Sequence, residues 1–142
     1  MTELVIDSSV VIKWFVPEPY SSEAQLILNQ FQQGTLDLLS PDLLYAEIGN
    51  ILWKKQRTQG LPANAATAIL QQFRAIPFAI TPCADLLDSA YRLAITHQRT
   101  VYDSLYLALS LREGCTFVTA DERLVNALTP HFPNVVWLAN WT

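Results

Sequence analysis

Short apolar runs alternate with longer amphipathic segments along the 142-residue chain. Residues 4–7 read Leu-Val-Ile-Asp, and further short runs occur at residues 36–39, 78–80, 116–119 and 135–138. The first run shows no polar alternation, which is typical of a strand buried on both faces. Strands separated by helices pair in parallel through right-handed crossovers. The pattern therefore predicts an α/β fold, a three-layer α/β/α sandwich around a central, mainly parallel sheet of about five strands.

Helix start and stop signals fill the segments between these runs. Ser22 to Gln25 has the form of a capping box, for a helix that stops at Gly34. Ser40-Pro41 and Thr81-Pro82 each place a capping side chain before a proline, which favours a helix start. We expect helices over residues 22–34, 40–60, 62–74, 81–98, 102–113 and 122–128.

Length and composition favour a single domain over residues 1–142. Hydrophobic residues make up 51% and charged residues 15%, which argues against disorder. The acidic start leads directly into the first strand, and no apolar run approaches the roughly 20 residues of a membrane helix. We therefore expect a cytoplasmic protein with no membrane association. The net charge of -4 argues against a generic basic nucleic-acid binder.

Most cofactor and catalytic motifs are missing from the sequence. The four glycines are not spaced as a dinucleotide or phosphate loop requires. Cys83 and Cys115 form no CxxC pair and are expected to be packed thiols. His97 and His131 lie far apart in the sequence and suggest neither a triad nor a zinc site. The remaining candidates are carboxylates.

Three aspartates stand at element ends. Asp7 ends the first predicted strand, and Asp121 follows the strand at residues 116–119. Each could simply cap the next helix. Asp103 would be the third helical residue of a capping box begun by Thr100, near the favourable end of the helix dipole.

Glu47 falls inside the apolar arc of its predicted helix, towards one edge. A lone carboxylate there must be partnered, because its burial is costly. An ion pair with Lys54, Lys55 or Arg57 is one explanation. A place in a cluster with the three aspartates is the other.

The four carboxylates could converge at one point. Asp7 and Asp121 meet if the first and fourth strands are neighbours, and Asp103 and Glu47 could face the same spot. Like charges about 4 Å apart repel by about 4 kcal/mol at an effective dielectric near 20. Oxygen ligands without cysteine or histidine suit Mg²⁺ or Mn²⁺. Two such ions would bring the formal charge from -4 to 0, so the acidic composition does not exclude a polyanionic substrate.

Four blocks of the sequence resemble the PIN domains of VapC-type toxins. They are Val5–Phe15 (VIDSSVVIKWF), Pro41–Asn50 (PDLLYAEIGN), Tyr102–Leu109 (YDSLYLAL) and Thr119–Leu124 (TADERL). The blocks occur in the family's order and span nearly the whole chain, with no departure at an acidic position. The stretch between residues 60 and 100 carries little family-specific signal.

The resemblance implies a metal-dependent endoribonuclease, the toxin of a toxin–antitoxin pair, which hydrolyses RNA by a metal-activated water and leaves a 5′-phosphate and a 3′-hydroxyl. Asp7, Asp103 and Asp121 would hold Mg²⁺ or Mn²⁺, and Glu47 would bind directly, through water or at a second ion. The hydroxyls of Ser9 and Thr119 would support the cluster. A homodimer and inhibition by a small antitoxin are also implied.

Substrate contacts and alternative functions stay open at this point. The candidates for RNA backbone contacts are Lys13, Lys54, Lys55, Arg57 and Arg99, and those for base stacking are Trp14 and Trp53. The lysines could equally be a solvated helix end, and Trp14 could be core. One alternative function is a PIN-like module that binds RNA or a partner without cutting. The other is a metal-dependent phosphatase with Asp7 as nucleophile, although Ser9 stands where that chemistry normally has a second acid.

Overall fold

All five strands of the sheet run parallel, in the order β3-β2-β1-β4-β5. The structure is a computed structural model that describes residues 2–142. Its strands are β1 (Thr2–Ile6), β2 (Leu36–Pro41), β3 (Ala79–Thr81), β4 (Thr116–Thr119) and β5 (Val135–Trp137). Its α-helices are α1 (Ser8–Val11), α2 (Ser21–Gln32), α3 (Leu43–Thr58), α4 (Ala63–Arg74), α5 (Cys83–His97), α6 (Val101–Glu113) and α7 (Glu122–Leu128). Two short 3₁₀ turns are η1 (Ile12–Trp14) and η2 (Leu138–Asn140).

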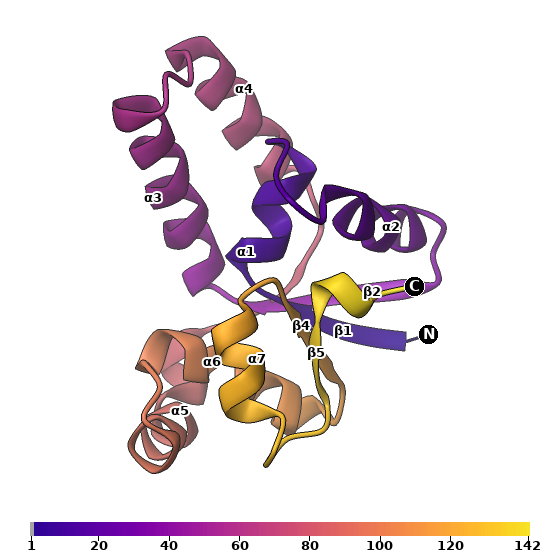
Figure 1. Cartoon of the computed structure of the whole chain (residues 1–142), viewed down its shortest axis with the longest axis vertical. Coiled ribbons are helices and arrows are strands. Elements are labelled where there is room, and N and C mark those ends of the chain that lie inside the picture. Colours follow the sequence, from indigo (N-terminus) through magenta and orange to yellow (C-terminus); the bar gives the residue numbers. More distant parts are fainter. Residues whose placement is uncertain (1) are drawn as a thin grey trace.

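Helices cover both faces of the sheet, which confirms the predicted three-layer sandwich (Figure 1). Helices α1 to α4 pack on one face, where Leu4 and Ile6 of β1 point into the core. Helices α5, α6 and α7 pack on the other face, where Val5 points. Because both faces of β1 are buried, its sequence shows no polar alternation.

The order of the strands places β1 between β2 and β4. Val5 is in register with Leu39 of β2 on one side and with Phe117 of β4 on the other. The chain builds β2 and β3 on one side of β1 and then crosses to build β4 and β5. The predicted adjacency of the first and fourth strands is therefore confirmed. Ligands of such sheets bind beyond the carboxyl ends of the strands at this reversal, where Asp7 and Asp121 stand.

Helix α6 follows its sequence signals closely. The Thr100 hydroxyl accepts a hydrogen bond from the Asp103 backbone N–H at 3.1 Å. Gly114 ends the helix in the left-handed conformation, with φ of 64°. All residues from 104 to 110 are buried, as expected for a helix that is apolar almost all round. Of the helices in residues 2–142, none is long and apolar enough to cross a membrane.

Two predicted helix starts are wrong, because a strand occupies them. Ser40-Pro41 and Thr81 belong to β2 and β3, and Pro41 is in register with Thr81. Helix α3 begins only at Leu43. The Asp42 carboxylate instead accepts a hydrogen bond from the Cys83 N–H at 2.9 Å, at the first residue of α5. Strand pairing across about 40 residues thus overrides the local capping signal.

The predicted capping box at Ser22 is also absent. Helix α2 begins at Ser21, and the preceding Tyr20 adopts a left-handed conformation without any side-chain cap. The Ser22 hydroxyl donates to the Glu23 carboxylate, and the Ser21 hydroxyl accepts from the Glu18 N–H at 3.0 Å. The helix therefore starts from a tight turn over residues 18–21.

Candidate active site

The acidic edge is the end of the sheet at which the parallel strands finish, with Glu47, Asp103 and Asp121 near it. Asp7 lies at its centre. It directly follows β1 and caps α1, where Oδ1 accepts from the Ser9 N–H at 3.1 Å and from the Ser9 hydroxyl. Its other oxygen, Oδ2, accepts from the Thr119 hydroxyl at 2.6 Å. Only 7% of the residue is exposed. Asp7 is thus a buried carboxylate held in one orientation by side chains of α1 and β4.

Ser9 and Thr119 each face two ways. Besides donating to Asp7, the Ser9 hydroxyl accepts from the Ala120 N–H at 3.0 Å, and the Thr119 hydroxyl accepts from the Asp121 N–H at 3.2 Å. Each hydroxyl has one proton, and both protons point to Asp7. The loop after β4, which carries Asp121, is thereby fixed to the end of β1.

Asp121 is the N-cap of α7, and Asp103 lies in the first turn of α6. Asp121 Oδ1 accepts from the Leu124 N–H at 3.2 Å and so caps α7. Asp103 is held through its backbone N–H by Thr100. The capping explanation is therefore right for Asp121, and it does not exclude a second role, because a carboxylate has about four acceptor positions.

Glu47 is half-buried on α3 and is bound by a tyrosine. The Tyr106 hydroxyl of α6 donates to Glu47 Oε1 at 2.5 Å. The alternative ion pair with a neighbouring lysine or arginine is not formed: none of the three ion pairs within residues 2–142 includes Glu47. Lys55 pairs instead with Glu18.

Burial and mutual repulsion raise the pKa values of three carboxylates at this edge. The pKa of Asp7 is raised to about 6, mainly by burial; the charges of Glu47 and Asp103 act in the same direction, and the hydrogen bonds from Ser9 and Thr119 act against it. Burial also raises the pKa of Glu47, and Asp103 adds to it. The pKa of Asp103 is raised by burial and then by Asp121. Each of the four acids therefore acts electrostatically on another member of the set.

The carboxylate oxygens of the four acids are ligands that suit a hard divalent cation, but the four side chains do not form a compact group. No ion pair of residues 2–142 neutralises any of the four acids. Within that range, no three histidine, cysteine, aspartate or glutamate side chains are close enough together to hold an ion as they stand. Asp7 is fixed, whereas Asp121 is exposed and Glu47 and Asp103 are only partly buried.

Comparison with known proteins relates this chain to a protein family. The family model of the PIN domain matches residues 4–127. The chain is 33% identical over 126 residues to the ribonuclease VapC3 of Pyrobaculum aerophilum, over 86% of this chain and 92% of that protein. The chain belongs to the PIN domain family. The resemblance predicted from the four sequence blocks is confirmed.

Solved structures share the fold of this PIN domain. The crystal structure of PAE2754 from Pyrobaculum aerophilum superimposes with a TM-score of 0.72 at 22% identity, over 97% of this chain and 85% of that one. A toxin–antitoxin complex from Klebsiella pneumoniae has a TM-score of 0.63 at 16% identity, over 94% of this chain and 95% of that one. At such identities the likeness concerns the architecture alone.

The basic residues proposed for RNA contacts fall into two groups in this PIN domain. Lys13 and Lys55 are mostly buried and donate to opposite oxygens of Glu18, at 3.0 and 2.9 Å. Lys54 is exposed on α3, two turns from Glu47 on the same side of the helix. Arg99 acts on Asp103, where its charge lowers the carboxyl pKa against the larger effect of burial. Arg99 is thus the basic residue of this set whose charge acts on an acid of the acidic edge, whereas Lys54 lies two helical turns from Glu47.

Neither tryptophan proposed for base stacking lies free at that edge. Trp14 stacks on Phe78 with ring centroids 6.2 Å apart, and its indole N–H donates to the Ala24 carbonyl at 2.7 Å. Trp14 is therefore a packing residue. Trp53 is 55% exposed, but Arg57 already covers its ring at 5.0 Å.

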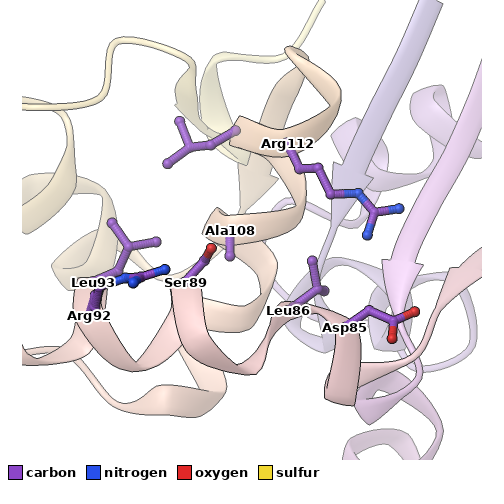
Figure 2. Close-up of a pocket in the computed structure, with 8 residues that line it drawn as sticks. Asp85, Leu86, Ser89, Arg92, Leu93, Ala108 and Arg112 are labelled. Atoms are coloured by element: carbon purple, nitrogen blue, oxygen red, sulfur yellow. The ribbon is translucent and has the colours of Figure 1, made fainter.

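A well-formed hollow of the surface is separate from the acidic edge. It has a volume of about 500 Å³ and lies between α5 and α6, with Arg92, Leu93 and Arg112 among its walls (Figure 2). Its α6 walls come from the carboxyl half of that helix, whereas Asp103 stands in the first turn. None of the four candidate acids lines it. Cavity size therefore does not indicate the active site of this protein.

Three side-chain pairings could not be foreseen from the sequence. Tyr106 is one of seven consecutive buried residues in α6, so no local pattern marks it as the partner of Glu47. Glu18 meets Lys55 across 37 residues. His97, which ends α5 as expected, packs against His131 with ring centroids 5.0 Å apart, although the sequence suggested no partner for either.

Replacing Tyr106 by phenylalanine tests its bond to Glu47. We expect Tyr106→Phe to lower the free energy of unfolding by about 1 to 2 kcal/mol at pH 8, because a hydrogen bond to a charged group is lost. The loss should shrink at pH 4, where the raised pKa of Glu47 leaves this carboxyl largely protonated. Urea unfolding at both values measures the effect. An equal loss at both would mean that Tyr106 acts through packing, and Tyr102→Phe, at an exposed position of the same helix, is the matched control.

Proposed function

We propose that this PIN domain is a metal-dependent endoribonuclease and the toxin of a toxin–antitoxin pair. The observation that carries the proposal is the buried Asp7 carboxylate, oriented by Ser9 and Thr119 and repelled by Glu47 and Asp103, with no ion pair to any of these three acids within residues 2–142. The relationship to a protein named as a ribonuclease supports the substrate. The fold shared with a toxin–antitoxin complex supports the biological role.

The four acids are the proposed holders of Mg²⁺ or Mn²⁺. Asp7, Asp103 and Asp121 would bind it directly, and Glu47 would bind it directly, through water or as part of a second site. A bound divalent cation supplies a water of lowered pKa and stabilises developing charge on a phosphodiester. Ser9 and Thr119 each donate a hydrogen bond to one Asp7 oxygen and so fix the orientation of this carboxylate. Tyr106 orients the Glu47 carboxylate in the same way.

Lys54 and Arg99 are the proposed contacts to the RNA backbone. The charge of Arg99 acts on Asp103, and Lys54 lies two helical turns from Glu47 and forms none of the ion pairs found in residues 2–142. Lys13 and Lys55 would act indirectly, by holding Glu18. An RNA strand with a backbone phosphate beside Lys54 would extend along α3 towards Glu47.

An antitoxin and a second copy of the chain are the proposed partners. A carboxy-terminal antitoxin segment lying across the acidic edge would place a basic side chain where no cation of the toxin pairs with the acids. Such a segment would compete with both the divalent ion and the RNA. The homodimer is proposed from family membership.

Incubation with single-stranded RNA tests the function directly. We expect the purified chain to cut RNA internally when Mg²⁺ or Mn²⁺ is present, to leave 5′-phosphate ends, and to stop when a chelator is added. A small phosphomonoester tested in parallel should remain intact, because Ser9, which donates to Asp7, stands where a phosphatase would have its second acid. Hydrolysis of the phosphomonoester alone would favour the phosphatase. RNA binding without metal-dependent cleavage would favour the inactive binding module.

A further inference from the structure

An aromatic pair lies next to the acidic edge and has no role in the function proposed so far. Trp137, the last residue of β5, is in register with Thr119 of β4, whose hydroxyl holds Asp7. The ring of Tyr20 meets the Trp137 ring edge-on, with centroids 5.5 Å apart and planes at 70°. Tyr20 precedes α2, so the pair joins segments more than 100 residues apart. It stands one strand away from the strand that leads into Asp121.

Tyr20 is held in an unfavourable backbone conformation. Its φ of 67° and ψ of 18° lie in the left-handed region, which a bulky side chain rarely adopts. Its side chain is 41% exposed, so burial explains only part of its placement. Strain of this kind persists where the surrounding structure determines it, and such residues cluster at functional sites.

The turn before Tyr20 is fixed to η1 and α3 through Glu18. Glu18 accepts from Lys13 of η1 and from Lys55 of α3, and its N–H donates to the Ser21 hydroxyl. Prolines at positions 17 and 19 limit the backbone on either side of Glu18. The segment from Pro17 to Tyr20 is therefore conformationally restricted. Glu18 fixes it to η1 and α3, and Tyr20 contacts Trp137 of β5.

Trp137 carries a donor without an acceptor. Its indole Nε1 is the single buried side-chain nitrogen or oxygen in residues 2–142 that has no hydrogen-bond partner. A buried donor of this kind costs free energy until an acceptor reaches it. A ligand whose carbonyl oxygen, ring nitrogen or hydroxyl reached this N–H would provide that acceptor.

We infer that Tyr20 and Trp137 form a stacking site for one unpaired base of the RNA, beside the acidic edge, and that Tyr20 is a positioning residue for the substrate. The inference rests on the proposed ribonuclease function. Unpaired bases stack on aromatic side chains, and base edges carry the acceptors that the Trp137 N–H lacks. The two tryptophans first considered for base stacking are engaged elsewhere, Trp14 by Phe78 and Trp53 by Arg57.

Cleavage kinetics on single-stranded RNA of about ten nucleotides, a length within usual single-strand site sizes, test the inference. From a panel of such strands, the one that the wild-type chain cuts fastest is prepared with an abasic position at each nucleotide in turn. One abasic position should raise KM for the wild-type chain by about 5-fold to 100-fold, the range expected for one stacked base. Tyr20→Ala should raise KM equally on the intact strand and leave kcat unchanged.

Combining Tyr20→Ala with the abasic strand tests whether Tyr20 contacts the missing base. On the strand that lacks the stacked base, Tyr20→Ala should behave like the wild-type chain, because the contact is already gone. Tyr20→Phe should keep the wild-type KM, and Tyr91→Ala on α5, at a still more exposed tyrosine, should change nothing. Circular dichroism confirms that the variants fold.

Two outcomes would overturn the stacking site. One is an unchanged KM for folded Tyr20→Ala on the intact strand. The other is an equal loss on intact and abasic strands, which would show that Tyr20 acts on the fold and not on a base. Absence of any cleavage by the wild-type chain would instead refute the ribonuclease function itself, so the two failures are distinguishable.

Discussion

Asp7→Asn is expected to abolish RNA cleavage and also to make the metal-free chain more stable at pH 8. The activity should fall by at least about 100-fold, the scale seen when one group that stabilises developing charge is removed. The gain in stability follows from burial, which raises the pKa of Asp7 to about 6. At pH 8 the chain must therefore keep a buried negative charge that asparagine does not carry.

The sign of the stability effect follows from proton binding. An unfolded Asp7 has a pKa of 3.8, whereas the folded one has a pKa of about 6. Between these values the folded state holds the extra proton, so stability falls as the pH rises through this window. The full difference corresponds to about 3 kcal/mol at pH 8. Asparagine removes this cost but must reorient one donor towards Ser9 or Thr119, so we expect a net gain of about 1 to 3 kcal/mol.

Thermal unfolding in a chelator and RNA cleavage in Mg²⁺ measure the two effects on the same preparation. Asp88→Asn, on the exposed side of α5, removes an equal charge away from the site and should alter neither. A folded Asp7→Asn chain that cuts at the native rate would remove Asp7 from the mechanism. A variant less stable than the wild type at pH 8 would show that the hydrogen bonds outweigh the buried charge.

The position of Asp7 and Asp121 at the same end of the sheet could be predicted because it follows from topology. A parallel sheet with helical crossovers places β1 beside β4, and the residues that follow them, Asp7 and Asp121, then share one edge. The sequence also marks the start of α6, because the Thr100 cap is a local interaction. Features that depend on neighbouring residues or on the strand order alone were thus accessible without coordinates.

Long-range pairings set the limit of that prediction. Ser40-Pro41 has the local signature of a helix start, but pairing with β3 extends β2 through it. The acceptor at the start of α5 is Asp42, 41 residues earlier in the chain, and no local pattern points to it. The same holds for Tyr20 and Trp137, whose contact depends on where a turn and a distant strand end meet.

Cleavage and affinity for the divalent ion are expected to fall together as the pH drops below about 6. Asp7, whose pKa is raised to about 6, must lose its proton before it can bind a cation. The pKa values of Glu47 and Asp103 are raised as well, so protons compete at three of the four acids. Below the pKa of Asp7, its ionised fraction decreases about tenfold per pH unit, and activity should follow at subsaturating Mg²⁺.

The same competition predicts how the ion changes stability. At pH 8 a cation offsets the repulsion among the four acids, and an ion present at about 100 times its Kd should stabilise the chain by about 2.7 kcal/mol. At pH 5 the proton on Asp7 already removes much of that repulsion and weakens ion binding, so the increase in Tm should be much smaller. The Asp7→Asn variant should lose most of this difference between the two pH values.

Thermal unfolding with Mg²⁺, Mn²⁺ or a chelator at pH 5 and pH 8 separates the carboxylate site from nonspecific ion effects. Asp88→Asn should keep the wild-type pattern, because Asp88 lies on the exposed side of α5. If neither ion raises Tm at pH 8, even with RNA present, the four acids do not form an ion site. If the increase is equal at both pH values, the ion binds elsewhere, because a site containing Asp7 cannot bind equally well above and below its pKa.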